Sequence, residues 1–135
     1  MNGKAKTEFT TNEVSHLARV SLRQLQWWDE TRLIRPDGKR RASYRRYTHD
    51  DVFRTLLVAE LRQRRLSLQR VRNILKALSR SDRREDIESA PVLLVDATGL
   101  KHALIQSREE VVPRCARWSG AVFLIDLDEL RERLE

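Results

Sequence analysis

The sequence predicts a mainly α-helical N-terminal domain, with four helices and a two-stranded hairpin, followed by a small α+β unit. Three observations support this fold class. Between residues 10 and 80, apolar residues recur at helical spacing in four segments, each of which follows a Ser or Thr that can cap a helix. A basic run with a Pro-Asp-Gly turn signal separates the second segment from the third. After a charged stretch at 79–86, short runs of apolar residues indicate strands.

The first two helices are predicted between residues 10 and 34. Thr10 and Glu13 have the spacing of a capping box, in which the two residues bond to each other's backbone at the start of a helix. Ser21 is a favourable N-cap for the second helix. The predicted apolar faces consist of Val14 and Leu17 in the first helix, and of Leu22, Leu25 and Trp28 in the second.

The other side of the second helix carries side chains suited to contact with DNA. They are Arg23, Gln24, Gln26 and Trp27. Arginine and glutamine can read base edges from a helix in the major groove, and all of these types, with the Ser21 hydroxyl, can reach the phosphate backbone. We expect Trp28 to be core because it falls on the apolar face, whereas Trp27 lies off that face.

The basic run after the second helix predicts an exposed hairpin. Six basic residues and one acid lie between Arg35 and Arg46, so we expect this hairpin to contact phosphates. Its returning strand is predicted at 43–47, where Tyr44 and Tyr47 would seat the hairpin. Alternation places Arg45 and Arg46 on opposite faces, so that one of them can point to the DNA backbone. The other candidates are Lys39, Arg40 and Arg41, and the sequence does not decide which of them touch DNA.

A second pair of helices is predicted after the hairpin. Thr48 and Asp51 have capping spacing, and Ser67 can cap the helix that follows. The apolar faces are Val52, Phe53, Leu56, Leu57 and Leu61 in the third helix, and Leu68, Val71, Leu75 and Leu78 in the fourth.

Taken in order, these motifs form one pattern over residues 9–80: two capped helices, the pair Trp27-Trp28 with Asp29, a hairpin ending in Tyr44-Arg45-Arg46-Tyr47, and two more helices entered at Thr48 and at Leu66-Ser67-Leu68. The pattern resembles the winged helix-turn-helix of the MerR family of bacterial transcription regulators. This resemblance implies that Arg23 would face guanine O6 and N7, and that Trp27 would pack on the sugar-phosphate backbone.

Two positions depart from the family pattern. The family usually has glycine at Arg19, where a left-handed conformation costs other residues about 1–2 kcal/mol. Either the turn has another geometry here or Arg19 accepts that cost. At Trp27 the family commonly has tyrosine, whose hydroxyl can bond a phosphate, whereas an indole offers one N–H donor.

The remaining segments complete the predicted organisation. Residues 1–8 are expected to form a disordered arm and 81–90 a linker between the 9–80 domain and a small unit at 91–135. Strands are predicted at 92–95, 103–105 and 121–125. A helix is expected from Ser107, delayed or kinked by Pro113. Asp126 or Asp128 would cap a last helix bearing Leu127, Leu130 and Leu134.

Charge and composition narrow the class of protein. Residues 1–84 contain 21 Lys and Arg against 9 Asp and Glu, a balance of +12, whereas residues 85–135 contain 6 against 11, a balance of −5. The basic part is therefore the candidate for nucleic acid. No apolar run approaches the length of a membrane span, and one cysteine permits no internal disulfide, so a cytoplasmic protein is expected. Cys115 and His102 are single, so neither a metal site nor any cofactor is expected, and no catalytic motif indicates an enzyme.

Two functional hypotheses follow. The first is a transcription regulator that binds double-stranded DNA as a homodimer on a palindromic promoter site. The resemblance implies that such a dimer distorts the promoter spacer so that RNA polymerase can engage both promoter elements. The alternative is a protein-interaction module of the same fold, resembling chaperone modulators or antitoxins. The sequence leaves open whether the C-terminal unit dimerises, binds a small-molecule effector or docks a protein.

Overall fold

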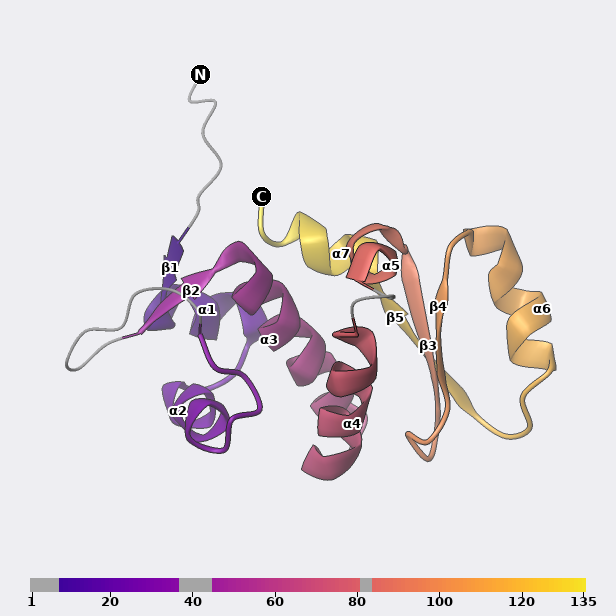
Figure 1. The fold of residues 1–135 in the computed structure, drawn as a ribbon, viewed down its shortest axis with the longest axis horizontal. Coiled ribbons are helices and arrows are strands. Elements are labelled where there is room, and N and C mark those ends of the chain that lie inside the picture. Colours follow the sequence, from indigo (N-terminus) through magenta and orange to yellow (C-terminus); the bar gives the residue numbers. More distant parts are fainter. Residues whose placement is uncertain (1–7, 37–44, 81–83) are drawn as a thin grey trace, which may run out of the picture. The chain divides into compact units, whose positions relative to one another are not determined.

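A computed structural model of the chain describes residues 8–36, 45–80 and 84–135. The backbone forms two compact units, Met1–Ala59 with Leu130–Glu135, and Glu60–Glu129 (Figure 1). The division falls within a helix and not in the predicted linker 81–90, of which residues 81–83 lie outside the described part. The predicted limits of the N-terminal domain, 9–80, stay a prediction.

The helices of the first unit begin where their caps predict. Helix α1 spans Thr11–Ala18, helix α2 spans Leu22–Glu30, and helix α3, which the division interrupts, spans His49–Gln63. At the start of α1, the backbone N–H of Thr10 donates to Oε1 of Glu13 at 2.8 Å, and the N–H of Glu13 donates to Oγ1 of Thr10 at 3.2 Å. Thr48 and Asp51 make the same reciprocal contacts at the start of α3. These predicted capping boxes are confirmed.

The conformation of Arg19 shows which of the two predicted geometries the turn after α1 adopts. It ends α1 in the left-handed conformation, with φ of 59° and ψ of 43°. The turn between α1 and α2 therefore has the geometry that glycine favours, and Arg19 adopts it in spite of the steric cost of its Cβ.

The returning strand predicted at 43–47 has a partner that the hairpin prediction did not include, while the hairpin itself stays a prediction. Strand β2, Arg46–Thr48, pairs antiparallel with strand β1, Glu8–Thr10, which places Phe9 opposite Tyr47. Both side chains are buried, and such a cross-strand aromatic pair stabilises the two-stranded sheet. Glu8, predicted in a disordered arm, is thus part of a strand. Residues 37–44, which include the predicted hairpin tip, lie outside the described residues.

The core follows the predicted helix faces except at Leu17 and Leu22. Leu25 and Trp28 are buried, as is the predicted face of α3, but Leu17 on α1 is only half-buried. Leu22 is 49% exposed, although it was predicted on the same apolar face as Leu25 and Trp28. It is the first residue of α2, and a helical side chain covers the turn that precedes its own Cα. No helical turn precedes Leu22, so it projects beyond the buried face.

The end of the chain belongs to this first unit. Helix α7, Leu127–Glu132, begins in the second unit, but residues Leu130–Glu135 group with the first. Leu130 and Leu134 are buried, although Leu134, predicted on the last helix, lies beyond the end of α7. The guanidinium of Arg131 lies 5.3 Å from the ring centroid of Phe53 on α3. The last six residues are therefore structural partners of the N-terminal helices.

The second unit is an α+β structure. Its sheet has the order β4-β3-β5, with all neighbours antiparallel, and consists of β3 at Val92–Asp96, β4 at His102–Ile105 and β5 at Val122–Asp126. The three predicted strands are confirmed to within one residue at each end. Two helices precede the sheet, α4 at Leu68–Leu78, capped by Ser67, and α5 at Arg84–Ser89. Helix α5 lies within the predicted linker 81–90; residues 84–89 include the helix formers Arg84, Glu85 and Glu88 and neither Gly nor Pro.

One face of the sheet is covered by a short helix. The 3₁₀ turn η2, Arg108–Glu110, leads into α6, Val111–Ala116, whose Cys115 packs against the cluster of Val92, Leu94, Ala103 and Ile105. Pro113 lies in the first turn of α6, where its missing N–H needs no partner, so it delays the helix without kinking it. Ser107 precedes η2 at the predicted helix start, although its side chain makes no capping hydrogen bond.

An ion-pair cluster joins η2 to the end of the sheet. Nη2 of Arg108 donates to Asp126 at 2.9 Å and to Asp128 at 3.0 Å, and these hydrogen bonds raise the pKa of Arg108. Asp126 also accepts from the N–H of Glu129 at 3.2 Å, which confirms Asp126 as the cap of α7. Because these side chains are exposed, water and salt screen their charges, so the cluster orients η2 more than it stabilises the unit.

Of the two described glycines of the second unit, Gly99 is the more sensitive to added volume. It has φ of 79° in the turn between β3 and β4, and a Cβ there would lie 2.9 Å from Cδ2 of Leu66 and 3.3 Å from Cβ of Arg70. Gly99→Ala should cost about 2–3 kcal/mol of unfolding free energy, from backbone strain and overpacking together. Gly120→Ala is the control, because Gly120 has φ of 83° but no atom within 4 Å of the added Cβ.

Urea denaturation of the two variants measures the difference. Gly120→Ala should lose only the backbone term of about 1–2 kcal/mol. Equal losses at the two glycines would show that contact with Leu66 and Arg70 contributes nothing.

Candidate nucleic-acid interface

Helix α2 separates a buried face from an exposed polar one. The exposed fraction is 2% for Leu25 and 3% for Trp28, but 53% for the neighbouring Trp27. The side chains on the exposed side line an open hollow on the surface, formed by Ser21, Arg23, Gln24, Gln26, Trp27 and Glu30. Apart from Glu30, these are the predicted DNA-contacting residues of the helix. Their exposure follows the predicted helix faces, while their contact with DNA stays a prediction.

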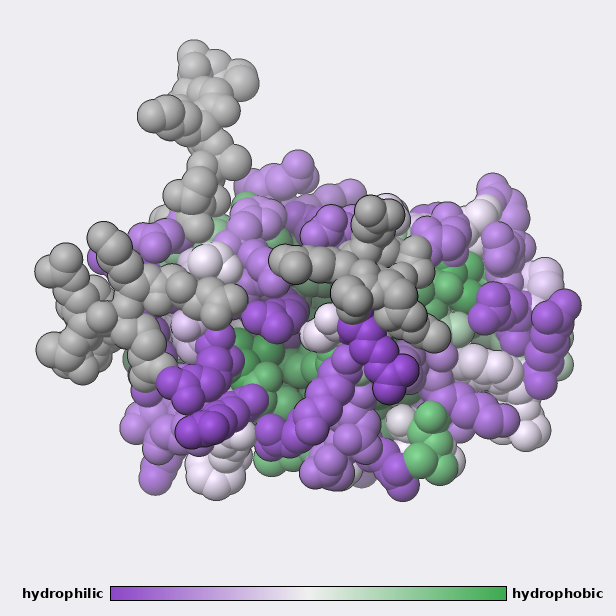
Figure 2. Space-filling model, in the orientation of Figure 1, coloured by the Kyte–Doolittle hydropathy of each residue, from purple (hydrophilic) through white to green (hydrophobic). Residues whose placement is uncertain are grey.

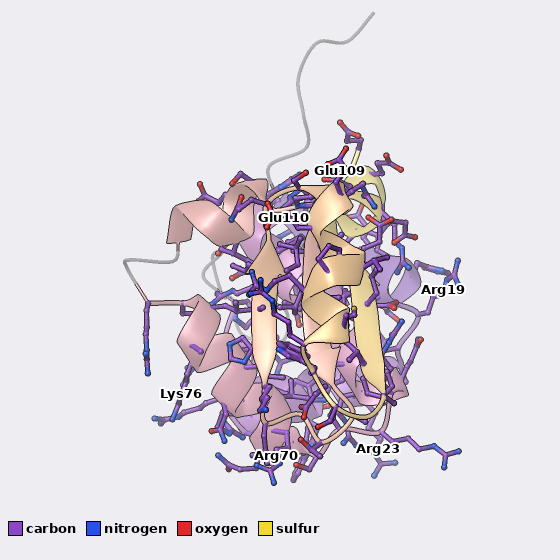
Figure 3. All side chains as sticks on the ribbon, turned by 90° about the vertical axis from the view of Figure 1, so that its right-hand side faces the viewer. Arg19, Arg23, Arg70, Lys76, Glu109 and Glu110 are labelled. Carbon is purple, nitrogen blue, oxygen red and sulfur yellow. The ribbon has the colours of Figure 1, made fainter. Side chains whose placement is uncertain are left out.

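Two of these residues are held by the helix cap. Oγ of Ser21 accepts from the N–H of Gln24 at 3.0 Å, and Oε1 of Gln24 accepts from the N–H of Ser21 at 3.1 Å. Ser21 therefore serves as the N-cap, as predicted, and the amide oxygen of Gln24 is engaged in the same capping box. Arg23, in contrast, extends away from the ribbon (Figure 3), where a guanidinium can reach a ligand.

The basic segment after α2 is only partly described. Lys39, Arg40, Arg41 and Tyr44 lie outside the described residues, so their predicted phosphate contacts cannot be placed. Arg46 is half-buried in β2, opposite Thr10. Arg45 has a protein partner, because its Nε donates to Oδ2 of Asp29 on α2. Its side chain is 22% exposed, so a contact with DNA would have to use the exposed part of a guanidinium that Asp29 already binds.

Asp29 is the residue of this region that sequence reasoning missed. It is 4% exposed and contacts Arg45 as well as Arg35, whose Nε lies 3.9 Å from Oδ1. A signal was present in the sequence, because Asp29 lies four residues after Leu25 and therefore on the same side of the helix. A carboxylate on a buried face requires a cationic partner, and the basic run supplies two.

The second unit carries basic side chains at one end and acidic side chains at the other. In Figure 3, Arg70 and Lys76 of α4 extend from one end of this unit, and Glu109 and Glu110 lie at the other. Figure 2 shows hydrophilic residues over most of the visible face, with a hydrophobic patch at the turn between β3 and β4. This turn contains Leu100, which is 63% exposed.

The described residues contain neither a candidate metal site nor a membrane-spanning helix. No group of three or more His, Cys, Asp or Glu side chains there is placed to hold a metal ion. Within the same ranges, no helix is both long and apolar enough to cross a bilayer.

Comparison with protein families finds a match that includes α2. Residues 9–78 match the family described as MerR HTH family regulatory protein, and this match covers more than half of the 135 residues. The chain belongs to the MerR family. The matched range contains α1 to α4 and β2, which confirms the family resemblance of residues 9–80 to within two residues.

Other comparisons add little to this assignment. A solved structure of a MerR-family transcriptional regulator from Bacillus cereus shares 24% sequence identity, with a TM-score of 0.47. The similarity covers 50% of this chain and 51% of that one, so the two proteins share about half of their length. A comparison with curated proteins finds no match.

Proposed function

We propose that this MerR-family protein is a sequence-specific DNA-binding transcription regulator that inserts α2 into the major groove. The observation that carries the proposal is the division of α2 into two faces. Leu25 and Trp28 anchor the helix, while Arg23, Gln26 and Trp27 are exposed together on its other side. A rigid helix with long polar side chains on one face has the form required to read base edges.

The charge distribution supports the same proposal. Residues 1–84 have a balance of +12, and phosphate neutralisation of this kind supplies most of the affinity for non-specific DNA. The excess of acid in residues 85–135 disfavours DNA contact by that part of the chain. We propose further that it acts as a homodimer on a palindromic promoter site, where it distorts the spacer for RNA polymerase, and that it catalyses no reaction.

Selection of bound fragments from sheared genomic DNA tests the proposal. The full-length protein is mixed with the fragments at low salt and again near physiological salt, and the bound DNA is sequenced. An inverted repeat that survives at the higher salt is the expected result, because base contacts persist when phosphate contacts are screened. Enrichment without a motif that vanishes with salt would reject sequence-specific regulation and favour a protein partner.

Arg23 should determine one position of the selected site. Arg23→Ala removes a bidentate donor and should cost about 1–3 kcal/mol on the preferred sequence, with relaxed preference at that one base pair. Competition binding with single-base variants of the site measures both effects.

Arg23→Lys is the matched variant, because it keeps the charge but loses the planar fork. It should lose preference at that base pair while keeping its salt dependence. Unchanged affinity and preference in Arg23→Ala would show that α2 is not placed as proposed.

A further inference from the structure

Asp29 connects the two ends of the basic segment that follows α2. Arg35 lies just after the helix, and Arg45 lies just before strand β2. Both arginines contact the Asp29 carboxylate through Nε, Arg45 at Oδ2 and Arg35 at Oδ1. The same buried carboxylate therefore binds one arginine after α2 and one just before β2.

The burial of Asp29 makes these contacts consequential. Its side chain is 3% exposed, whereas those of Arg45 and Arg35 are 22% and 52% exposed. A buried carboxylate without a cationic partner is strongly destabilising, so its contact with Arg45 constrains where that arginine can lie. The contact with Arg35, at 3.9 Å and largely in solvent, is the weaker of the two.

Contact with Asp29 leaves both arginines able to bind an anion. A guanidinium has five N–H donors, and the contacts seen here use Nε. The terminal Nη groups can therefore donate to a phosphate while Nε stays on the carboxylate. Such an arrangement fixes the orientation of the guanidinium before DNA arrives, which lowers the entropy lost on binding.

We propose that Asp29 is a positioning residue for DNA binding, which holds Arg35 and Arg45 so that these two arginines and α2 engage the phosphate backbone together. The proposal rests on the proposed function, because it assigns a role within the same interface. An acidic residue on α2 would then increase the affinity for DNA.

The decisive experiment compares Asp29→Asn with Glu30→Gln in the full-length protein. Each variant removes one negative charge from α2 at neighbouring positions, but Glu30 is exposed. If only net charge mattered, both variants would bind DNA more tightly. We expect Glu30→Gln to bind more tightly and Asp29→Asn to bind about tenfold more weakly on every sequence, since tenfold corresponds to about 1.4 kcal/mol. Asp29→Glu, which retains the charge, should recover part of the affinity.

The salt dependence provides a second measure that lost stability alone would not change. Loss of positioned phosphate contacts should reduce the slope of log affinity against log salt by about one for each contact, although Asp29→Asn makes the protein more positive. Base preference should stay unchanged, because Arg23 is untouched. Tighter binding by Asp29→Asn, or an unchanged slope in a folded variant, would overturn the proposal.

A cycle of variants without DNA separates this inference from the proposed function. Arg45→Gln removes one cationic partner of the buried Asp29 and should lower the urea midpoint, whereas adding Asp29→Asn to it should restore part of the midpoint. Restoration without any DNA binding by the native protein would reject the proposed function and leave Asp29 with only a structural role. Additive losses in the cycle would reject the coupling itself. Intact helical circular dichroism in each variant confirms that the compared proteins are folded.

Discussion

Deleting Leu130–Glu135 is expected to abolish DNA binding, although these residues are the most distant in sequence from α2. The segment groups with residues Met1–Ala59 and contributes the buried Leu130 and Leu134. Loss of a buried leucine side chain typically costs about 2–5 kcal/mol. Loss of two should therefore consume much of a total stability of about 5–15 kcal/mol. We expect a chain ending at Glu129 to show little cooperative thermal unfolding and no specific DNA complex.

Point variants in the same segment provide the control. Leu134→Ala should lower the melting temperature and Glu132→Gln should not, because Leu134 is 7% exposed and Glu132 is exposed. Circular dichroism on heating measures stability, and a mobility shift with the selected site measures binding. Native melting and native affinity in the deleted chain would show that the segment is dispensable, and that residues 9–80 fold as the separate domain that the sequence predicts.

The sequence predicted the features that depend on neighbouring residues. Helix starts at Thr10, Ser21 and Ser67 follow from side-chain capping within three positions, and the structure contains each cap. The strands β3 to β5 follow from short apolar runs bounded by turn or polar residues. These signals are local, so no knowledge of the tertiary fold was needed.

The features that were missed depend on contacts between distant residues. Strand β2 pairs with β1, nearly 40 residues away, and the sequence around Arg46 contains nothing that specifies this partner. The prediction considered only a nearby hairpin arm, because short loops close at lower entropic cost. That arm falls largely in residues 37–44, outside the described residues, so the hairpin stays a prediction. The return of residues 130–135 to the N-terminal unit was missed for the same reason.

The interface shows the same limit at the level of side chains. Helical periodicity placed Trp27 and Trp28 on opposite sides correctly. It did not reveal that Arg45, predicted to contact phosphate, is held by Asp29. Charge in a basic run indicates an anionic partner, but the sequence alone cannot separate a phosphate from a buried carboxylate of the same protein.

Trp28→Ala is expected to lower mainly the stability of the protein, and Trp27→Ala mainly its affinity for DNA, although the two residues are adjacent. Trp28 is 3% exposed, and removal of a buried tryptophan side chain should cost about 3–5 kcal/mol through lost burial and the cavity left behind. Trp27 is 53% exposed, and exposed substitutions usually change stability by less than about 0.5 kcal/mol. Urea denaturation followed by circular dichroism should therefore distinguish the two variants clearly.

DNA affinity provides the other half of the comparison. In Trp27→Ala the fold should be retained, and affinity should fall on all sequences alike, because an indole that packs on the sugar-phosphate backbone carries no base information. Trp27→Tyr, which has a phenolic O–H in place of the indole N–H, should retain most of the affinity. If Trp27→Ala lost stability as Trp28→Ala does, the exposed face of α2 would be assigned incorrectly. If it kept full affinity, the DNA would lie elsewhere, and the role of Arg23 would have to be re-examined with it.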